Sequence, residues 1–127
     1  MKGLPYFTQR AIFTATGYAN VCTADIPLPL TRIPSKWSIQ VTGVAADGTT
    51  NVAASSWTVS LQGSLDGIGY DGDSTAAIVV HTNGTNADGS VVTSGANFSP
   101  VRFVRIHCSS LSKGSANGIL VSVVGEP

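Results

Sequence analysis

Two segments that each begin with tryptophan alternate strictly between apolar and polar residues. Residues 37–42 read Trp-Ser-Ile-Gln-Val-Thr, and residues 57–62 read Trp-Thr-Val-Ser-Leu-Gln. Successive side chains of a β-strand point to opposite faces, so this period of two predicts two strands that each bury one face. The pattern is typical of a soluble all-β domain, and it specifies no chemistry by itself.

Further strands are expected on both sides of this pair. The expected strands cover residues 10–15, 19–24, 37–44, 57–62, 76–82, 99–107 and 119–124. Residues 119–124 are almost continuously apolar, which predicts a strand buried on both faces. Asp-Gly and Asn-Gly pairs mark turns between the segments. Seven to eight short strands at this spacing predict one all-β domain over residues 1–127, a two-sheet antiparallel sandwich or jelly roll.

Two segments are expected to be extended arms. One is the N-terminal segment, residues 1–9. The other is residues 25–35, which contain three prolines. Each proline removes a backbone donor and fixes φ, so this segment is not expected to form a central strand.

Charge is scarce in this chain. Charged residues make up 11% of the sequence and the formal net charge is zero, which leaves little self-repulsion and favours association. The chain lacks the excess of basic residues that a nucleic-acid-binding protein needs. It also contains no apolar run of about 20 residues, so no membrane span is predicted. No signal peptide is recognised, so synthesis in the cytoplasm is expected.

The order of the charges follows a pattern. Every charge between Lys36 and Arg102 is acidic. If the acidic turns cluster at one end of the sandwich, the molecule has surfaces of opposite sign. Such surfaces let copies of the chain meet head-to-tail or dock on a charged partner. A chance partition of the charges explains the same order equally well.

No constellation of residues predicts catalysis, so we expect neither an enzyme nor a cofactor. His107 and Cys108 are neighbours, and neighbours on a strand point to opposite faces, which prevents a dyad. A zinc site would also need Cys22 and His81, and the spacing of these four residues lacks the short ligand pairs that zinc sites use. The two cysteines are expected to be buried thiols, with a disulfide between them as the alternative.

The acidic loop 64–74 contains Asp66, Asp71 and Asp73. These three are the candidate metal ligands, because oxygen-rich loops bind Ca²⁺, yet the EF-hand pattern fails for lack of a following glutamate. The alternative is a solvated turn in which aspartates bond to their own backbone. Tyr70 lies in the same loop and is a candidate platform for a glycan; the alternatives are a loop anchor or an interface contact.

Three segments carry a family resemblance. They are V-x-L-x-G-S-x-D-G at residues 59–67, Phe-Val-Arg-Ile at 103–106, and a final apolar strand at 118–124. Over residues 37–124 the chain resembles a β-sandwich common among virion proteins of tailed bacteriophages. It departs from that pattern where Tyr70 occupies the aromatic position inside a longer acidic loop, and the proline-rich arm has no counterpart.

The resemblance implies a structural virion protein, most like a capsid decoration (cement) protein. Such a protein binds the major capsid protein on the outside of the shell, often as a trimer, and locks neighbouring subunits. The arms would then reach neighbouring subunits. The candidate partner-binding residues are Tyr6, Phe7, Arg10, Ile26, Leu28, Leu30 and Arg32.

Two alternatives stay open. One is a carbohydrate-binding or adhesion module, because residues 101–106 are also similar to the late strand of discoidin-like sandwiches. The other is a different phage part, such as a tail, neck or head-fibre protein.

Overall fold

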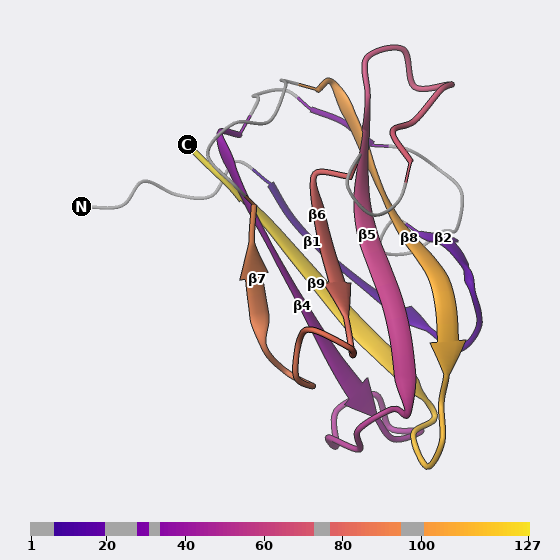
Figure 1. Ribbon diagram of the computed structural model, residues 1–127. Helices are drawn as coiled ribbons and strands as arrows, with labels where there is room; N and C mark the ends of the chain where they lie inside the picture. Colours follow the sequence, from indigo (N-terminus) through magenta and orange to yellow (C-terminus); the bar gives the residue numbers. More distant parts are fainter. Residues whose placement is uncertain (1–6, 20–27, 31–33, 73–76, 95–100) are drawn as a thin grey trace.

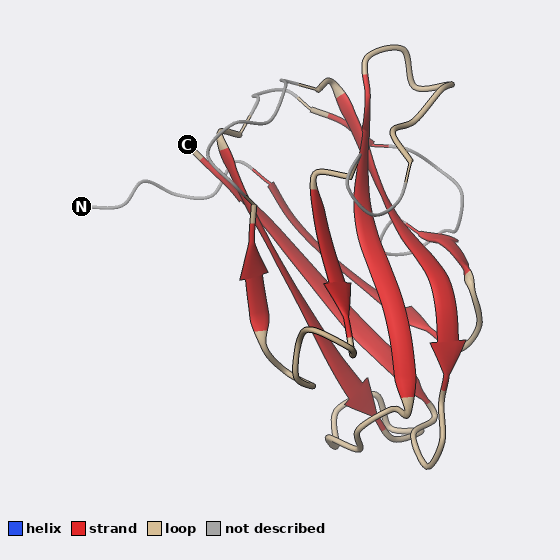
Figure 2. Ribbon diagram, in the orientation of Figure 1, coloured by secondary structure: helices blue, strands red, loops and turns tan. Residues whose placement is uncertain are grey.

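A computed structural model describes most of the chain (Figure 1). The described residues are 7–19, 28–30, 34–72, 77–94 and 101–127. They form strands and loops, with no helix among them, as the colouring in Figure 2 shows. Consequently, no helix in these ranges is long and apolar enough to cross a membrane. Five residues singled out from the sequence lie outside the described ranges: Tyr6, Cys22, Ile26, Arg32 and Asp73.

One sheet, sheet A, has the strand order β1-β9-β4-β7, and all neighbours are antiparallel. Its strands are β1 (Phe7–Phe13), β9 (Gly118–Glu126), β4 (Lys36–Val44) and β7 (Val91–Thr93). The long strands β9 and β4 pair along their full length, from Lys36 opposite Glu126 to Val44 opposite Gly118. Sheet A is therefore built around a strand from the end of the sequence.

The other sheet, sheet B, has the order β2-β8-β5-β6, and β3 also pairs with β8. Its strands are β2 (Gly17–Ala19), β3 (Leu28–Pro29), β5 (Ser56–Ser64), β6 (Val79–Thr82) and β8 (Phe103–Ser112). The pairing of β5 with β8 shifts register between Thr58 and Val59, as at a β-bulge. The predicted two-sheet antiparallel sandwich is confirmed.

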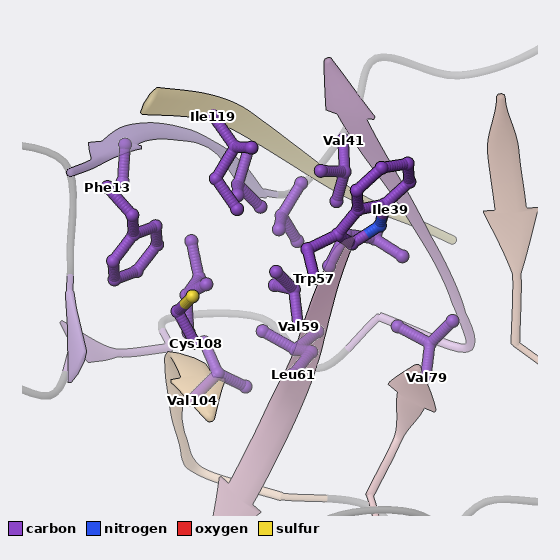
Figure 3. Close-up of a cluster of buried hydrophobic side chains, with 14 of the residues drawn as sticks. Phe13, Ile39, Val41, Trp57, Val59, Leu61, Val79, Val104, Cys108 and Ile119 are labelled. Atoms are coloured by element: carbon purple, nitrogen blue, oxygen red, sulfur yellow. The ribbon is translucent and has the colours of Figure 1, made fainter. Parts of the chain in front are cut away.

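The core lies between the two sheets (Figure 3). The alternating apolar residues of β4 and β5 are all buried, as the period of two predicts: Trp37, Ile39, Val41, Trp57, Val59 and Leu61. From β8, Val104, Ile106 and Cys108 join them, and Phe13 and Ile119 contribute from sheet A. Both tryptophan-led strands thus face one common apolar layer.

Two strands are buried differently from the prediction. The polar face of β5 was expected to be only half-buried, yet Ser60, Gln62 and Ser64 are also buried, so β5 is covered on both faces. In contrast, β9 alternates between buried and half-buried residues and is not buried on both faces. The reason is that sheet A packs on sheet B through one face only, which leaves Leu120 and Val124 half-covered on the other.

The expected N-terminal arm partly belongs to sheet A. Residues 7–9 lie in β1 and pair with residues 123–125, so β1 begins earlier than the residue 10 predicted. Phe7 packs on Trp37 edge-to-face, with ring centroids 5.4 Å apart, which explains the earlier start. In the proline-rich segment, Leu28 and Pro29 pair with β8, whereas residues 25–27 and 31–33 lie outside the described ranges.

Candidate functional site

The loop that follows β5 projects from one end of the sandwich (Figure 1). Asp66 organises it, because its Oδ1 accepts hydrogen bonds from the backbone N–H of Ile68 (2.8 Å) and Gly69 (2.9 Å) and from the Ser64 hydroxyl (3.0 Å). Gly67 has a φ of +75°, which favours glycine, and its N–H donates to Ser64 Oγ at 2.9 Å. The loop is thus held in one shape by its own hydrogen bonds.

These hydrogen bonds engage the Asp66 carboxylate within its own turn. Hydrogen bonds from the Ile68 and Gly69 backbone, and from Ser64, lower the pKa of the Asp66 carboxyl below its ordinary value. Asp71 is exposed, and Asp73 lies outside the described residues. Within the described ranges, no group of three His, Cys, Asp or Glu side chains could hold a metal ion. The geometry around Asp66 is that of a carboxylate bonded to its own backbone.

The same loop exposes two large apolar side chains. Leu65 is 69% exposed and Ile68 is 87% exposed. They flank the Asp66-Gly67 turn, so the rigid loop presents them outward. Neither residue was a candidate from the sequence, although two aliphatic residues around an Asp-Gly turn are a readable signal.

An aromatic and cationic stack covers the outer face of sheet B. The Arg105 guanidinium lies 3.9 Å from the ring centroid of Tyr18 and 4.1 Å from that of Tyr70. His107 stacks on Tyr18 with centroids 4.3 Å apart. Arg105 Nε also donates to Gln62 Oε1 at 2.7 Å. Arg105 thus contacts Gln62 on the polar face of β5, and its contact with Tyr70 links the projecting loop to β8.

Tyr70, the candidate glycan platform, is already engaged in this stack. Its ring contacts Arg105, and its hydroxyl is buried with no hydrogen-bond partner among the described residues. Burial raises the pKa of that hydroxyl. A shallow hollow of about 380 Å³ lies beside it, lined in part by Ser64, Asp66 and Asp71. In this geometry Tyr70 anchors the loop.

A buried histidine joins the two sheets. The indole nitrogen of Trp57 donates to His81 Nδ1 at 2.9 Å, and because an indole nitrogen only donates, Nδ1 carries no proton. The proton is therefore on Nε2, which donates to the Ser90 carbonyl at 2.9 Å. Burial lowers the pKa of His81, which keeps it neutral at pH 7. Ser90 Oγ lies 3.2 Å from Nε2, but a protonated nitrogen cannot act as its general base.

Cys108 and His107 lie on opposite faces of β8, as expected for neighbours in a strand. Cys108 is a free, fully buried thiol whose pKa is raised to about 11 by burial. His107 is half-buried on the outer face. The two side chains do not form a nucleophile and base pair.

Four of the candidate partner-binding residues lie in the described ranges, and these four do not form one surface. Phe7 packs against the core, and Arg10 is exposed on the outer face of sheet A. Leu28 pairs with Val104 in sheet B, and Leu30 is partly buried against the core. These residues are thus divided between the core and both sheets.

The acidic turns also do not gather at one end. Asp47 lies in the connection from β4 to β5, whereas Asp66 and Asp71 follow β5 at the opposite end. Hydrogen bonds from Thr50 and Thr49 lower the pKa of Asp47 to about 2. The clustering considered from the charge order is therefore not found.

No protein-family model, curated protein or solved structure matches this chain.

Proposed function

We propose that this chain is a structural protein of a phage virion that binds the outer surface of the capsid. Its partner is the major capsid protein, and each copy bridges neighbouring capsid subunits. The mechanism is passive, because the binding energy of every copy opposes rupture or further expansion of the shell.

One observation supports this proposal most. A charge-poor sandwich holds two exposed apolar side chains, Leu65 and Ile68, on a loop that its own hydrogen bonds keep rigid. Exposed apolar groups of this kind favour protein contacts, and a loop already in its bound shape loses little entropy on docking. The resemblance to phage virion sandwiches adds support, since its segments lie in β5, β8 and β9.

The carbohydrate-binding alternative receives less support. A glycan platform needs a free aromatic face and reachable polar groups. Tyr70 instead contacts Arg105, and its hydroxyl is buried.

Quantitative mass spectrometry of purified particles from the source tests the proposal. We expect a ratio to the major capsid protein near one or a simple fraction of one. A handful of copies per particle would assign the chain to a tail or neck. Absence from particles would contradict the virion role.

A deletion tests the role of the N-terminal arm. The deletion has to stop at residue 6, because Phe7 lies in β1 and packs on Trp37. We expect the shortened chain to keep its far-UV circular dichroism and to lose binding to stripped capsids in co-sedimentation. Unchanged binding would show that residues 1–6 do not contribute to capsid binding.

A further inference from the structure

The sequence contains two Asn-Gly pairs, Asn83-Gly84 in the turn after β6 and Asn117-Gly118 at the start of β9. In such a pair the backbone nitrogen of the glycine can attack the side-chain carbonyl carbon of the asparagine, because glycine has no Cβ to crowd the approach. The attack requires the backbone of the pair to turn toward the asparagine side chain. The fold therefore decides which of the two pairs is able to react.

The pair at the start of β9 is fixed in sheet A. Gly118 is buried and pairs with Val44, and the backbone N–H of Asn117 donates to the Val44 carbonyl at 2.8 Å. A Cβ at Gly118 would lie 2.5 Å from the carbonyl oxygen of Phe13, so packing requires glycine at this position. The backbone of this pair cannot rotate without breaking the contacts of β9.

The pair after β6 is much less restrained. Asn83 and Gly84 are both exposed. The turn is closed by hydrogen bonds to the Thr82 carbonyl from residues 85 and 86, and within the described ranges the Gly84 N–H has no acceptor. Nothing lies within 4 Å of a Cβ built at Gly84, and Gly84 is not among the glycines with a positive φ. Neither packing nor backbone conformation therefore requires glycine here.

The Asn83 carboxamide is held loosely and in a suitable environment. Its Nδ2 donates to the Ser55 carbonyl at 3.4 Å, and its Oδ1 accepts from the Trp57 N–H at 3.3 Å. Both distances exceed the usual range of about 2.7–3.2 Å, so these bonds restrain the side chain weakly. The Trp57 N–H also faces Oδ1, the atom that becomes negatively charged when the carbonyl carbon is attacked, and a donor at that place favours the attack.

We propose that Asn83 is a site of spontaneous deamidation. The Gly84 nitrogen gives its proton to hydroxide and forms a bond to Asn83 Cγ, while the bond from Cγ to Nδ2 breaks and Nδ2 takes up a proton and leaves as ammonia. Water then opens the resulting cyclic imide at either of its carbonyl carbons. The products carry aspartate or isoaspartate at position 83, and the reaction needs only water and hydroxide.

The modification changes both charge and structure. Each event adds one negative charge to a chain whose formal net charge is zero. The new carboxylate also replaces the Nδ2 donor beside the Ser55 carbonyl, so two acceptors face each other there. Isoaspartate lengthens the backbone of the turn by a methylene group. The modified turn is therefore expected to separate from the segment that leads into β5.

Peptide mapping by mass spectrometry of the folded chain, aged in mildly alkaline buffer, tests the proposal. We expect the amide of Asn83 to be lost roughly tenfold or more faster than that of Asn117, since Asn117 reacts only after local opening of β9. Asn117 is thus an internal control in the same molecule. In concentrated urea the fold no longer distinguishes the two pairs, and their rates should become similar.

Gly84→Ala is the matched variant. The open space around Gly84 and its ordinary φ allow alanine, so the variant should keep its far-UV circular dichroism and its urea midpoint. The added Cβ crowds the attacking nitrogen, so loss of the Asn83 amide should slow severalfold, while the rate at Asn117 should stay the same.

Two results would each overturn the proposal. One is a loss of amide at Asn83 that is no faster than at Asn117 in the folded chain. The other is an unchanged rate at Asn83 in the Gly84→Ala chain. Neither result bears on whether the chain binds a capsid.

Discussion

At the residue scale, the two tryptophans that lead β4 and β5 are both buried but have different polar environments. The indole N–H of Trp57 donates to His81. The indole N–H of Trp37 is buried without a partner among the described residues. An unpaired buried donor costs about 1–3 kcal/mol, so the two side chains contribute differently to stability.

Trp57→Phe is expected to destabilise the protein more than Trp37→Phe does. Both changes remove ring volume, but only the first leaves His81 Nδ1 without its donor, whereas the second removes a donor that has no partner. The expected difference in the free energy of unfolding is about 1–3 kcal/mol, measured by urea denaturation. Equal losses would contradict this account.

The sequence predicts the burial of both tryptophans, because alternation places them on the apolar face. It does not predict which indole is paired. The partner of Trp57 lies on β6. The alternation of residues within one strand does not predict which strands become its neighbours in the sheet.

At the element scale, His81 connects three segments. It accepts from Trp57 of β5, lies in β6, and donates to Ser90 just before β7. Strand β6 is an edge of sheet B and β7 is an edge of sheet A. His81 therefore links the edge strand of one sheet to the residue that precedes the edge strand of the other.

Stability is expected to fall as the pH drops below about 6.5, the ordinary pKa of histidine. Burial lowers the pKa of folded His81, and the opposing effects of the hydrogen bond with the Ser90 backbone and of the Asp88 charge are smaller. The unfolded chain therefore binds a proton first, and stability decreases until the pH passes the lowered pKa of the folded state. Urea midpoints measured across this window test the effect.

His81→Gln is the matched variant for this measurement. A glutamine amide can accept from Trp57 and donate to Ser90, but it does not titrate. Its urea midpoint should change less between pH 7 and pH 5 than that of the wild type. The same pH dependence in both proteins would assign the effect to other groups.

Gly43 of β4 lies against the backbone of residues 52–54. A Cβ at this position would contact the Val52 carbonyl and lie 2.6 Å from the Ala54 nitrogen. Backbone cannot move aside as a side-chain end can, so Gly43→Ala is expected to cost roughly 2 kcal/mol or more by urea unfolding. Gly69→Ala is the control, because nothing lies within 4 Å of a Cβ there. Similar stability of the two variants would contradict the close approach.

Strands β4, β5 and β8 could be predicted because their apolar residues alternate over several positions. Strand β7 was missed, since Val91–Thr93 is too short to show a period. The burial of Ser60 and Gln62 was also missed. At Gln62 the contact comes from Arg105, which lies on another strand and itself stacks on Tyr70 of the loop.

At the scale of the whole molecule, composition and alternation predict a sandwich, but not the pairing of its strands. The stack of Arg105, Tyr18 and His107 follows from the register of β2 on β8, where Tyr18 is opposite His107. Sequence alone therefore supplies the candidate residues but not the surfaces they form.

The central place of β9 in sheet A has a consequence for biosynthesis. Phe7 pairs with Gly125, and β4 pairs with β9 along its full length. While a ribosome still holds residues 118–126, β1 and β4 lack their shared partner and leave apolar side chains uncovered. Folding of sheet A is therefore expected only after β9 has left the ribosome, and until then the uncovered apolar side chains favour aggregation of the nascent chain.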